Sequence, residues 1–136
     1  MTRRVTLLTM CLAFLLTPAS ALAKHGGGGG GGDDGGRQEV RVAGTCGKGA
    51  TSRLRLRSQD GEIRAQLEIE HARSNRLWRV VFVQERRVVY RGRVRTHAGR
   101  FEIEHRLTDL PGADHVTARA VGPRGLTCTA AATLSG

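Results

Sequence analysis

The sequence predicts an all-β fold, built as an antiparallel sandwich or a barrel. Three observations lead to this fold class: apolar residues recur at every second position within residues 38–136, apolar patterns with the period of a helix are absent there, and turn-forming residues separate the apolar runs at short intervals. About eight short strands at this spacing are typical of a sandwich or a barrel.

The strands are expected to follow one another as short alternating segments. The first carries Val40, Val42 and Cys46 with the same parity. In the next two, leucine alternates with arginine over residues 53–57, and apolar residues alternate with polar and charged ones over residues 62–70. The remaining strands are expected at Leu77–Val83, which is nearly all apolar as in a central strand, and at Val88–Arg95, Phe101–Leu107, His115–Val121 and Leu126–Leu134.

Asp60-Gly61 predicts a two-residue hairpin turn between the second and third strands. A loop of these two residues puts Leu54 opposite Leu67 and Leu56 opposite Ala65, so both strands point their apolar sides the same way. The outward pairs are then Arg53 with Glu68, Arg55 with Gln66 and Arg57 with Arg64, with Arg55 also diagonal to Glu68. Opposite charges across such a pair contribute about 0.2–1 kcal/mol, so these arginines are partly neutralised by the neighbouring strand.

A short repeat places more carboxylates on the same face. Leu-Glu-Ile-Glu-His at residues 67–71 recurs as Phe-Glu-Ile-Glu-His at residues 101–105. If these two strands are adjacent, four glutamates gather on the outer face: Glu68, Glu70, Glu102 and Glu104. They form either a weak metal or hydrolytic site, or a salt-bridge lattice with Arg53, Arg55, Arg64, Arg100 and Arg106. We favour the lattice, and we expect no metal site and no cofactor, because His71 and His105 fall on the opposite parity.

The strands Leu77–Val83 and Val88–Arg95 predict a different outer face. If Trp78 and Phe82 point inward, the outward residues are valines and arginines. The candidate binding residues on this face are Arg79, Arg91, Arg93, Arg95 and Arg119. No acidic strand residue shares the face, although Glu85 lies in the adjoining turn. Such a mixture resembles a partner surface more than a solvated one, although an excess of arginine is also what a GC-rich genome produces.

The N-terminus predicts export. Residues 1–23 have the organisation of a secretory signal peptide, with an arginine pair, an apolar run and a small-x-small cleavage site that ends at Ala23 or Ala21. No second apolar run follows, so we expect no transmembrane segment in the mature chain. Residues 24–37 are nearly all glycine and predict a flexible linker, which leaves residues 38–136 as the β-sandwich domain. The expected location is secreted or periplasmic, by the general or the twin-arginine route.

Two cysteines remain in the mature chain, Cys46 and Cys128. An even number in an exported chain implies a disulfide bond. Trp78 on its apolar strand, and the segment LTDLPGADHVTARA at residues 107–120, resemble the buried tryptophan and the penultimate-strand corner of immunoglobulin-like and fibronectin-type domains. The resemblance implies an immunoglobulin-like antiparallel β-sandwich of about seven to eight strands, and it implies no active site.

The sequence favours binding over catalysis. It carries a net charge of +10, and it lacks a nucleophile motif, histidines at metal-ligand spacing and a phosphate loop. The aromatic residues of residues 38–136 have core parity, so we do not expect nucleic-acid binding by stacking. We expect a non-catalytic binding module that contacts an envelope protein or a polyanion through the arginines. The alternative is an accessory or inhibitor-like secreted domain without a ligand of its own.

Overall fold

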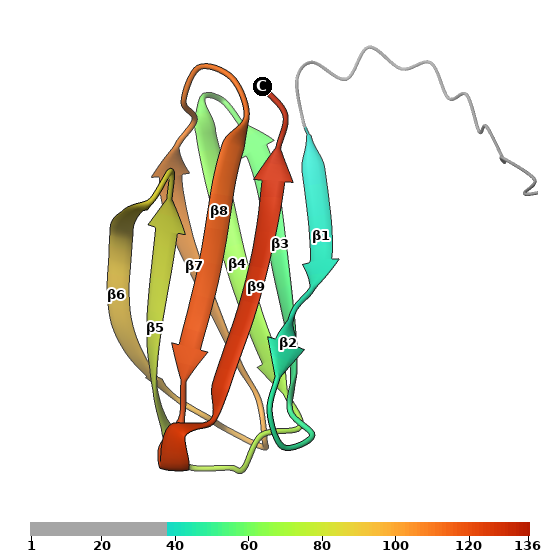
Figure 1. Cartoon of the computed structure of the whole chain (residues 1–136), viewed down its shortest axis with the longest axis vertical. Helices are drawn as coiled ribbons and strands as arrows, with labels where there is room; N and C mark the ends of the chain where they lie inside the picture. The colour runs from blue at the N-terminus through green and yellow to red at the C-terminus, as the bar shows by residue number, and fades with distance from the viewer. Residues whose placement is uncertain (1–37) are drawn as a thin grey trace, which may run out of the picture. The chain divides into compact units, whose positions relative to one another are not determined.

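The computed structural model describes residues 38–136, which form two antiparallel sheets packed face to face as a β-sandwich (Figure 1). The predicted signal peptide 1–23 and linker 24–37 lie outside the described residues. The first sheet has the order β1-β3-β4-β7 and the second β2-β9-β8-β5-β6. The strands are β1 (Glu39–Ala43), β2 (Thr45–Cys46), β3 (Thr51–Gln59), β4 (Glu62–Glu70), β5 (Leu77–Gln84), β6 (Arg87–Arg95), β7 (Phe101–Thr108), β8 (Asp114–Val121) and β9 (Thr127–Leu134), with a 3-10 turn η1 (Pro123–Gly125).

The β3–β4 hairpin has the predicted register. Asp60 and Gly61 form its loop with φ of 55° and 76°, the positive values that a type I′ turn requires. Leu54 lies opposite Leu67, and Arg53 lies opposite Glu68. β4 also pairs with β7, so the two halves of the Leu/Phe-Glu-Ile-Glu-His repeat are neighbours, which is the condition for gathering the four glutamates on one face.

The expected first strand divides at Gly44 into two strands that belong to different sheets. β1 pairs with β3 in the first sheet, whereas β2 pairs with β9 in the second. A Cβ atom on Gly44 would lie 2.3 Å from the Ser52 hydroxyl oxygen and 2.5 Å from the Thr129 carbonyl oxygen, so the crossing is open only to glycine. This division gives residues 38–136 nine strands.

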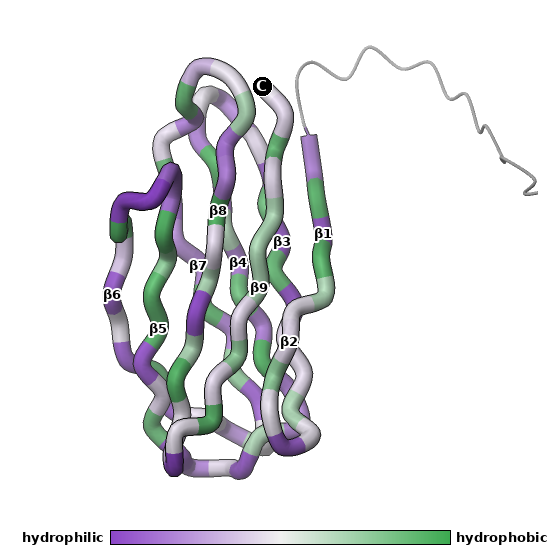
Figure 2. Tube along the Cα trace, viewed as in Figure 1, coloured by the Kyte–Doolittle hydropathy of each residue, from purple (hydrophilic) through white to green (hydrophobic). Residues whose placement is uncertain are grey.

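The core lies between the sheets and is built from the inward side of each strand. Figure 2 shows the alternation of apolar and polar residues along the strands that produces it. Trp78 is 1% exposed, and its ring centroid lies 5.6 Å from that of Phe101 across the core. The other large buried side chains include Leu54, Leu56, Ile63, Leu67, Ile69, Val80, Phe82, Val116 and Leu134. Within residues 38–136 there is no helix with the length and apolar character needed to cross a bilayer.

The strand connections differ from those of an immunoglobulin domain. There strands A, B, E and D form one sheet and C, F and G the other, so strand B is followed along the chain by a strand of the opposite sheet. Here β3 and β4 are consecutive and lie side by side. The Cys46–Cys128 disulfide joins directly opposed residues of β2 and β9 within one sheet, whereas the antibody disulfide links the two sheets.

The outer face of the first sheet carries salt bridges between glutamates and arginines, as favoured from the sequence, but Arg64, Arg100, Glu70, Glu102 and Glu104 are in none of those within residues 38–136. Arg53 contacts Glu68 at 3.2 Å, and Arg106 approaches Glu62 at 3.8 Å. The partner of Arg55 is not Glu68 but Glu39 on β1, at 2.9 Å. Alternate positions of the four strands supply as many glutamates as arginines: Glu39, Glu62, Glu68, Glu70, Glu102 and Glu104 against Arg41, Arg53, Arg55, Arg57, Arg64 and Arg106.

Glu39 is the centre of this lattice, because Arg41, Arg55 and Arg57 all contact its carboxylate. Desolvation alone would raise its pKa. Hydrogen bonds from Arg57 and Arg41, together with their positive charges, outweigh that effect and hold the pKa of Glu39 below its ordinary value.

The lowered pKa of Glu39 predicts a pH-dependent contribution to stability. A depressed folded-state pKa stabilises the fold above the ordinary glutamate pKa, and that stabilisation is lost as pH falls through the lowered folded-state value. Glu39→Gln should therefore have a lower free energy of unfolding in urea than wild type at neutral pH. This difference should shrink as the pH is made acid. A constant difference across this range would contradict the prediction.

The disulfide is predicted to be a large single contribution to stability. It closes a loop between residues 82 positions apart, which on the chain-entropy account stabilises the fold by about 4–5 kcal/mol. Cys46→Ser with Cys128→Ser should lower the free energy of unfolding in urea by an amount of that order. A reductant should destabilise wild type and leave the double variant unchanged; equal stability of oxidised and reduced wild type would refute the prediction.

Candidate functional site

The structure brings the five predicted arginines to one face of the second sheet. Arg79 on β5 lies directly opposite Arg93 on β6. One row further along, Val81 lies between Arg91 on β6 and Arg119 on β8. Because neighbouring strands are about 4.8 Å apart, these side chains leave the sheet close together. We call this surface the arginine face; it comprises Arg79, Arg91, Arg93, Arg95 and Arg119, and each of them is exposed.

The arginine face carries uncompensated positive charge. None of its arginines is in an ion pair with another residue of the described range 38–136, in contrast to the lattice on the first sheet. Arg95 donates from Nη1 to the Asn75 carbonyl and side-chain oxygens at 3.3 and 3.2 Å. The nearby carboxylate of Glu85 accepts a hydrogen bond from the His115 backbone N–H at 2.7 Å. Asn75 is uncharged, and Glu85 forms no ion pair with any arginine of the face.

Apolar side chains accompany these arginines. Val81 is half-buried between Arg91 and Arg119, and Val83 is half-buried further along β5 between Val88 and Thr117. Leu77 is 48% exposed. The β5–β6 register shifts between Phe82 and Val83, so an extra residue is inserted in β6. As a result both Val88 and Val89 are exposed, where strict alternation would have buried one of them.

Protection of a sheet edge explains only part of this surface. β6 is an edge strand, and arginines and a bulge on an edge discourage pairing with another chain. That accounts for Arg91, Arg93 and Arg95. Arg79 and Arg119 lie on β5 and β8, which are paired on both sides, so edge protection gives no reason for them.

The four glutamates of the first sheet do not assemble into a metal site. Glu68 lies opposite Glu102, but Glu104 lies opposite Gln66. The His71 ring contacts the Thr51 hydroxyl, and the His105 ring packs on Tyr90 with centroids 4.5 Å apart. Among residues 38–136 no three His, Cys, Asp or Glu side chains are grouped to hold a metal ion.

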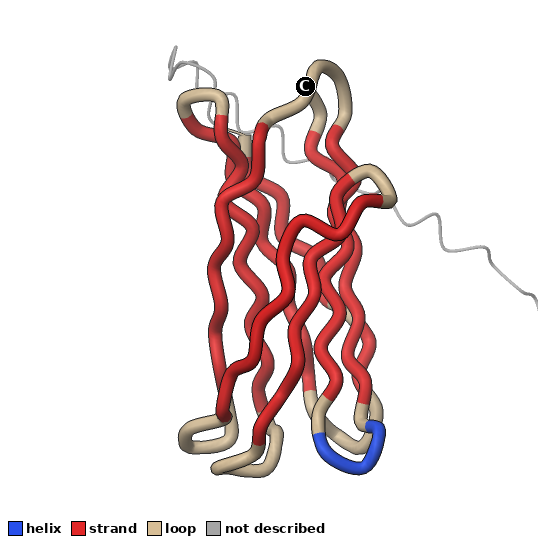
Figure 3. Tube along the Cα trace, turned by 90° about the vertical axis from the view of Figure 1, so that its left-hand side faces the viewer, coloured by secondary structure: helices blue, strands red, loops and turns tan. Residues whose placement is uncertain are grey.

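A basic pocket at one end of the sandwich was not predicted from the sequence. It has a volume of about 210 Å³ and is lined by Lys48, His71, Ala72, Arg73, Arg76, Trp78, Pro123, Arg124 and Leu126. These residues come from the β2–β3, β4–β5 and β8–β9 loops and the strand starts beside them, at the end of the sandwich that carries η1 (Figure 3). None of the lining residues is acidic.

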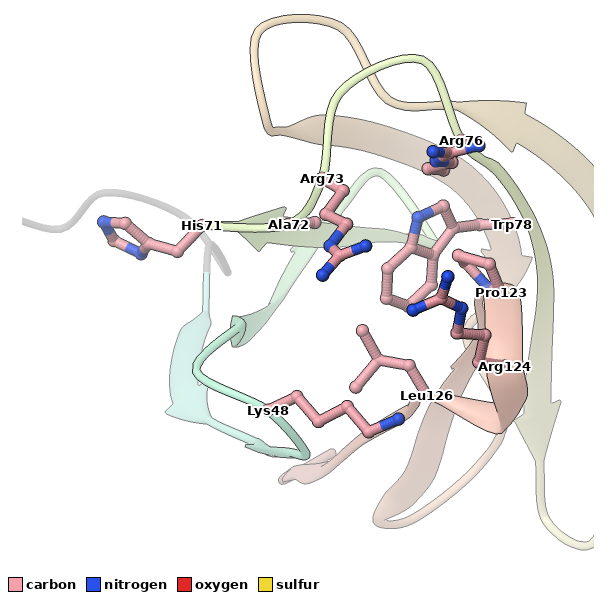
Figure 4. Close-up of a pocket in the computed structure, with 9 residues that line it drawn as sticks. All are labelled: Lys48, His71, Ala72, Arg73, Arg76, Trp78, Pro123, Arg124 and Leu126. Atoms are coloured by element: carbon pink, nitrogen blue, oxygen red, sulfur yellow. The ribbon is translucent and has the colours of Figure 1, made fainter.

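The indole of Trp78 supplies a free hydrogen-bond donor beside this pocket. Trp78 is 1% exposed, and its Nε1–H has no acceptor among the residues that the structure describes. Leaving such a donor unpaired costs about 1–3 kcal/mol. In Figure 4 the indole nitrogen lies on the edge of the ring that faces Arg73.

Periodicity could not reveal the pocket, because it says nothing about which loops converge. The local signals are arginines beside turn residues: Arg73 and Arg76 flank Ser74-Asn75, and Arg124 lies within Gly122-Pro123-Arg124-Gly125. Each alone is an ordinary solvated loop arginine, and only the folded chain places them around Trp78.

Comparison of the chain with protein-family models, with curated proteins and with solved structures gave no match. The functional argument therefore depends on the two basic surfaces themselves, the arginine face and the pocket.

Proposed function

We propose that the protein is an exported, non-catalytic binding module that contacts an acidic protein or a polyanionic envelope component through the arginine face. Export is supported by the cysteines, which are positioned as a disulfide bond between β2 and β9, since such bonds persist in oxidising compartments.

The observation that carries the proposal is unpaired charge on internal strands. Arg79 and Arg119 extend the charge of β6 across β5 and β8, and no carboxylate within residues 38–136 forms an ion pair with them. Arginines this close repel one another by about 0.5 kcal/mol per pair in water. An anionic partner removes that repulsion and gains charge-assisted hydrogen bonds.

The surroundings of the arginines support binding rather than plain solvation. Val81 lies between Arg91 and Arg119, and Val83 follows it on the same side of β5. Leu77 and Val89 are exposed. Arginine with apolar neighbours is the composition found in the buried part of protein interfaces, whereas a face that serves only solubility mixes both signs of charge.

Retention on a sulfated-polysaccharide resin tests the proposal. Arg91→Ser with Arg93→Ser and Arg95→Ser should weaken binding on the order of 100-fold, because each arginine near an anionic surface contributes about 1 kcal/mol. The salt concentration at elution should fall accordingly.

The matched control removes the same charge from the first sheet. Arg53→Ser with Arg64→Ser and Arg106→Ser should keep most of the retention, because the glutamates of that face offset its arginines. Equal losses in the two triple variants would show that net charge alone drives retention, and the arginine face would then be rejected as a binding surface.

A further inference from the structure

We propose that the pocket lined by Lys48, Arg73, Arg76, Trp78 and Arg124 is a phosphate-binding site. It is separate from the arginine face, and its residues come from loops rather than from the outer side of the second sheet. The ligand is a phosphate group, either the free anion or a phosphomonoester at the end of a larger molecule.

The charge and hydrogen-bond capacity of the pocket match that ligand. Four cationic side chains line it, and none of them is in an ion pair within residues 38–136. Figure 4 shows the Arg73 and Arg124 guanidinium groups turned toward the space beside Trp78 and Leu126, with His71 turned away. The buried indole Nε1–H adds a neutral donor that no described residue satisfies.

These donors are more than a carboxylate can use. A carboxylate carries one charge on two oxygens, whereas a phosphate near neutral pH carries up to two charges and presents several acceptor oxygens. The pocket volume of about 210 Å³ is below the range of about 300–1,000 Å³ found for sites of drug-sized ligands. A small anion or an end group fits this size.

The loops that carry the cations are held in place by buried contacts. The Thr96 hydroxyl, in a residue 2% exposed, donates to the Arg73 carbonyl oxygen at 2.6 Å and accepts from the Arg76 N–H at 2.9 Å. On the opposite wall Gly122 packs so closely that a Cβ atom there would lie 2.7 Å from the Trp78 ring.

Two of the cationic residues occupy a backbone conformation that non-glycine residues rarely adopt. Lys48 and Arg124 both have φ of 57°. Such residues are retained where the surrounding structure fixes them, and they are frequent at ligand sites. The disulfide between Cys46 and Cys128 ties the loop that carries Lys48 to the strand that follows Leu126.

The single tryptophan of the chain makes the test specific, because every indole N–H signal comes from Trp78. Inorganic phosphate is titrated into the protein, with chloride adjusted to keep ionic strength constant, while the indole N–H resonance is followed by NMR. We expect a saturable shift with phosphate and none with chloride alone. A resonance that responds equally to both salts would overturn the proposal.

Two double variants distinguish a specific phosphate site from general electrostatic attraction to a basic protein. Arg73→Gln with Arg124→Gln should weaken phosphate binding about tenfold or more, since hydrogen bonds to charged groups are strong. Arg64→Gln with Arg106→Gln removes the same charge from the first sheet and should leave phosphate binding unchanged. An equal effect of both pairs would refute the site, and the arginine face could still function without it.

A second titration with glycerol 3-phosphate identifies the source of the group. Binding as tight as that of inorganic phosphate, or tighter, assigns the pocket to the end of a phosphorylated molecule. A response to inorganic phosphate alone assigns it to the free anion. No response to either compound rejects the site.

Discussion

The constraint on which the structure depends is the burial of one side of every strand. Because side chains alternate across a strand, a shift of one residue in its register would exchange the core side and the solvent side of that strand. The Asp60-Gly61 turn fixes this choice for the first sheet, and burial of Trp78, Val80 and Phe82 fixes it for β5. Every outward charge follows from these choices: Arg53 reaches Glu68 because Leu54 is buried, and Arg79 faces solvent because Trp78 is buried.

Both sheets bury one side of each strand, but their outer faces carry different charges. On the first sheet glutamates and arginines occupy alternate positions of neighbouring strands, and Glu39 alone engages three arginines. A genome rich in GC accounts for many arginines, but it does not account for their separation from glutamate on one face only. The chain can pair its arginines, as the first sheet shows, and on β5, β6 and β8 it does not. That asymmetry is the physical basis for treating the arginine face as a binding surface.

The sequence predicted the features that depend on the order of residues within a strand or a turn. The hairpin register and the shared face of the five arginines follow from period and turn chemistry, and the disulfide follows from the even number of cysteines in a chain predicted to be exported. The adjacency of the two Glu-Ile-Glu segments is a condition of the four-glutamate hypothesis and not a consequence of period. The division of the expected first strand at Gly44 could not be predicted in this way. The alternation of inward residues continues from Val42 to Cys46, although the chain passes from one sheet to the other between them. The role of Glu39 depends on β1 pairing with β3, and the pocket depends on three loops converging. Both depend on tertiary structure, which the alternation of apolar and polar residues along a strand does not determine.

The two basic surfaces are adjacent, and this adjacency has an electrostatic consequence. Arg79 and Arg93 line a shallow depression that also includes Gly122 and Pro123, and Pro123 lines the pocket as well. Gly122 is held against Trp78, so the turn between the two surfaces is fixed by the core itself. Positive potential therefore continues from the β5–β6 strands round the turn to the loops. Exposed charges separated by more than about 8 Å are largely screened at physiological ionic strength, so the two surfaces attract an anion jointly only where their arginines approach this closely. The geometry nevertheless keeps the two separable, since the arginine face is built on strands and the pocket on loops.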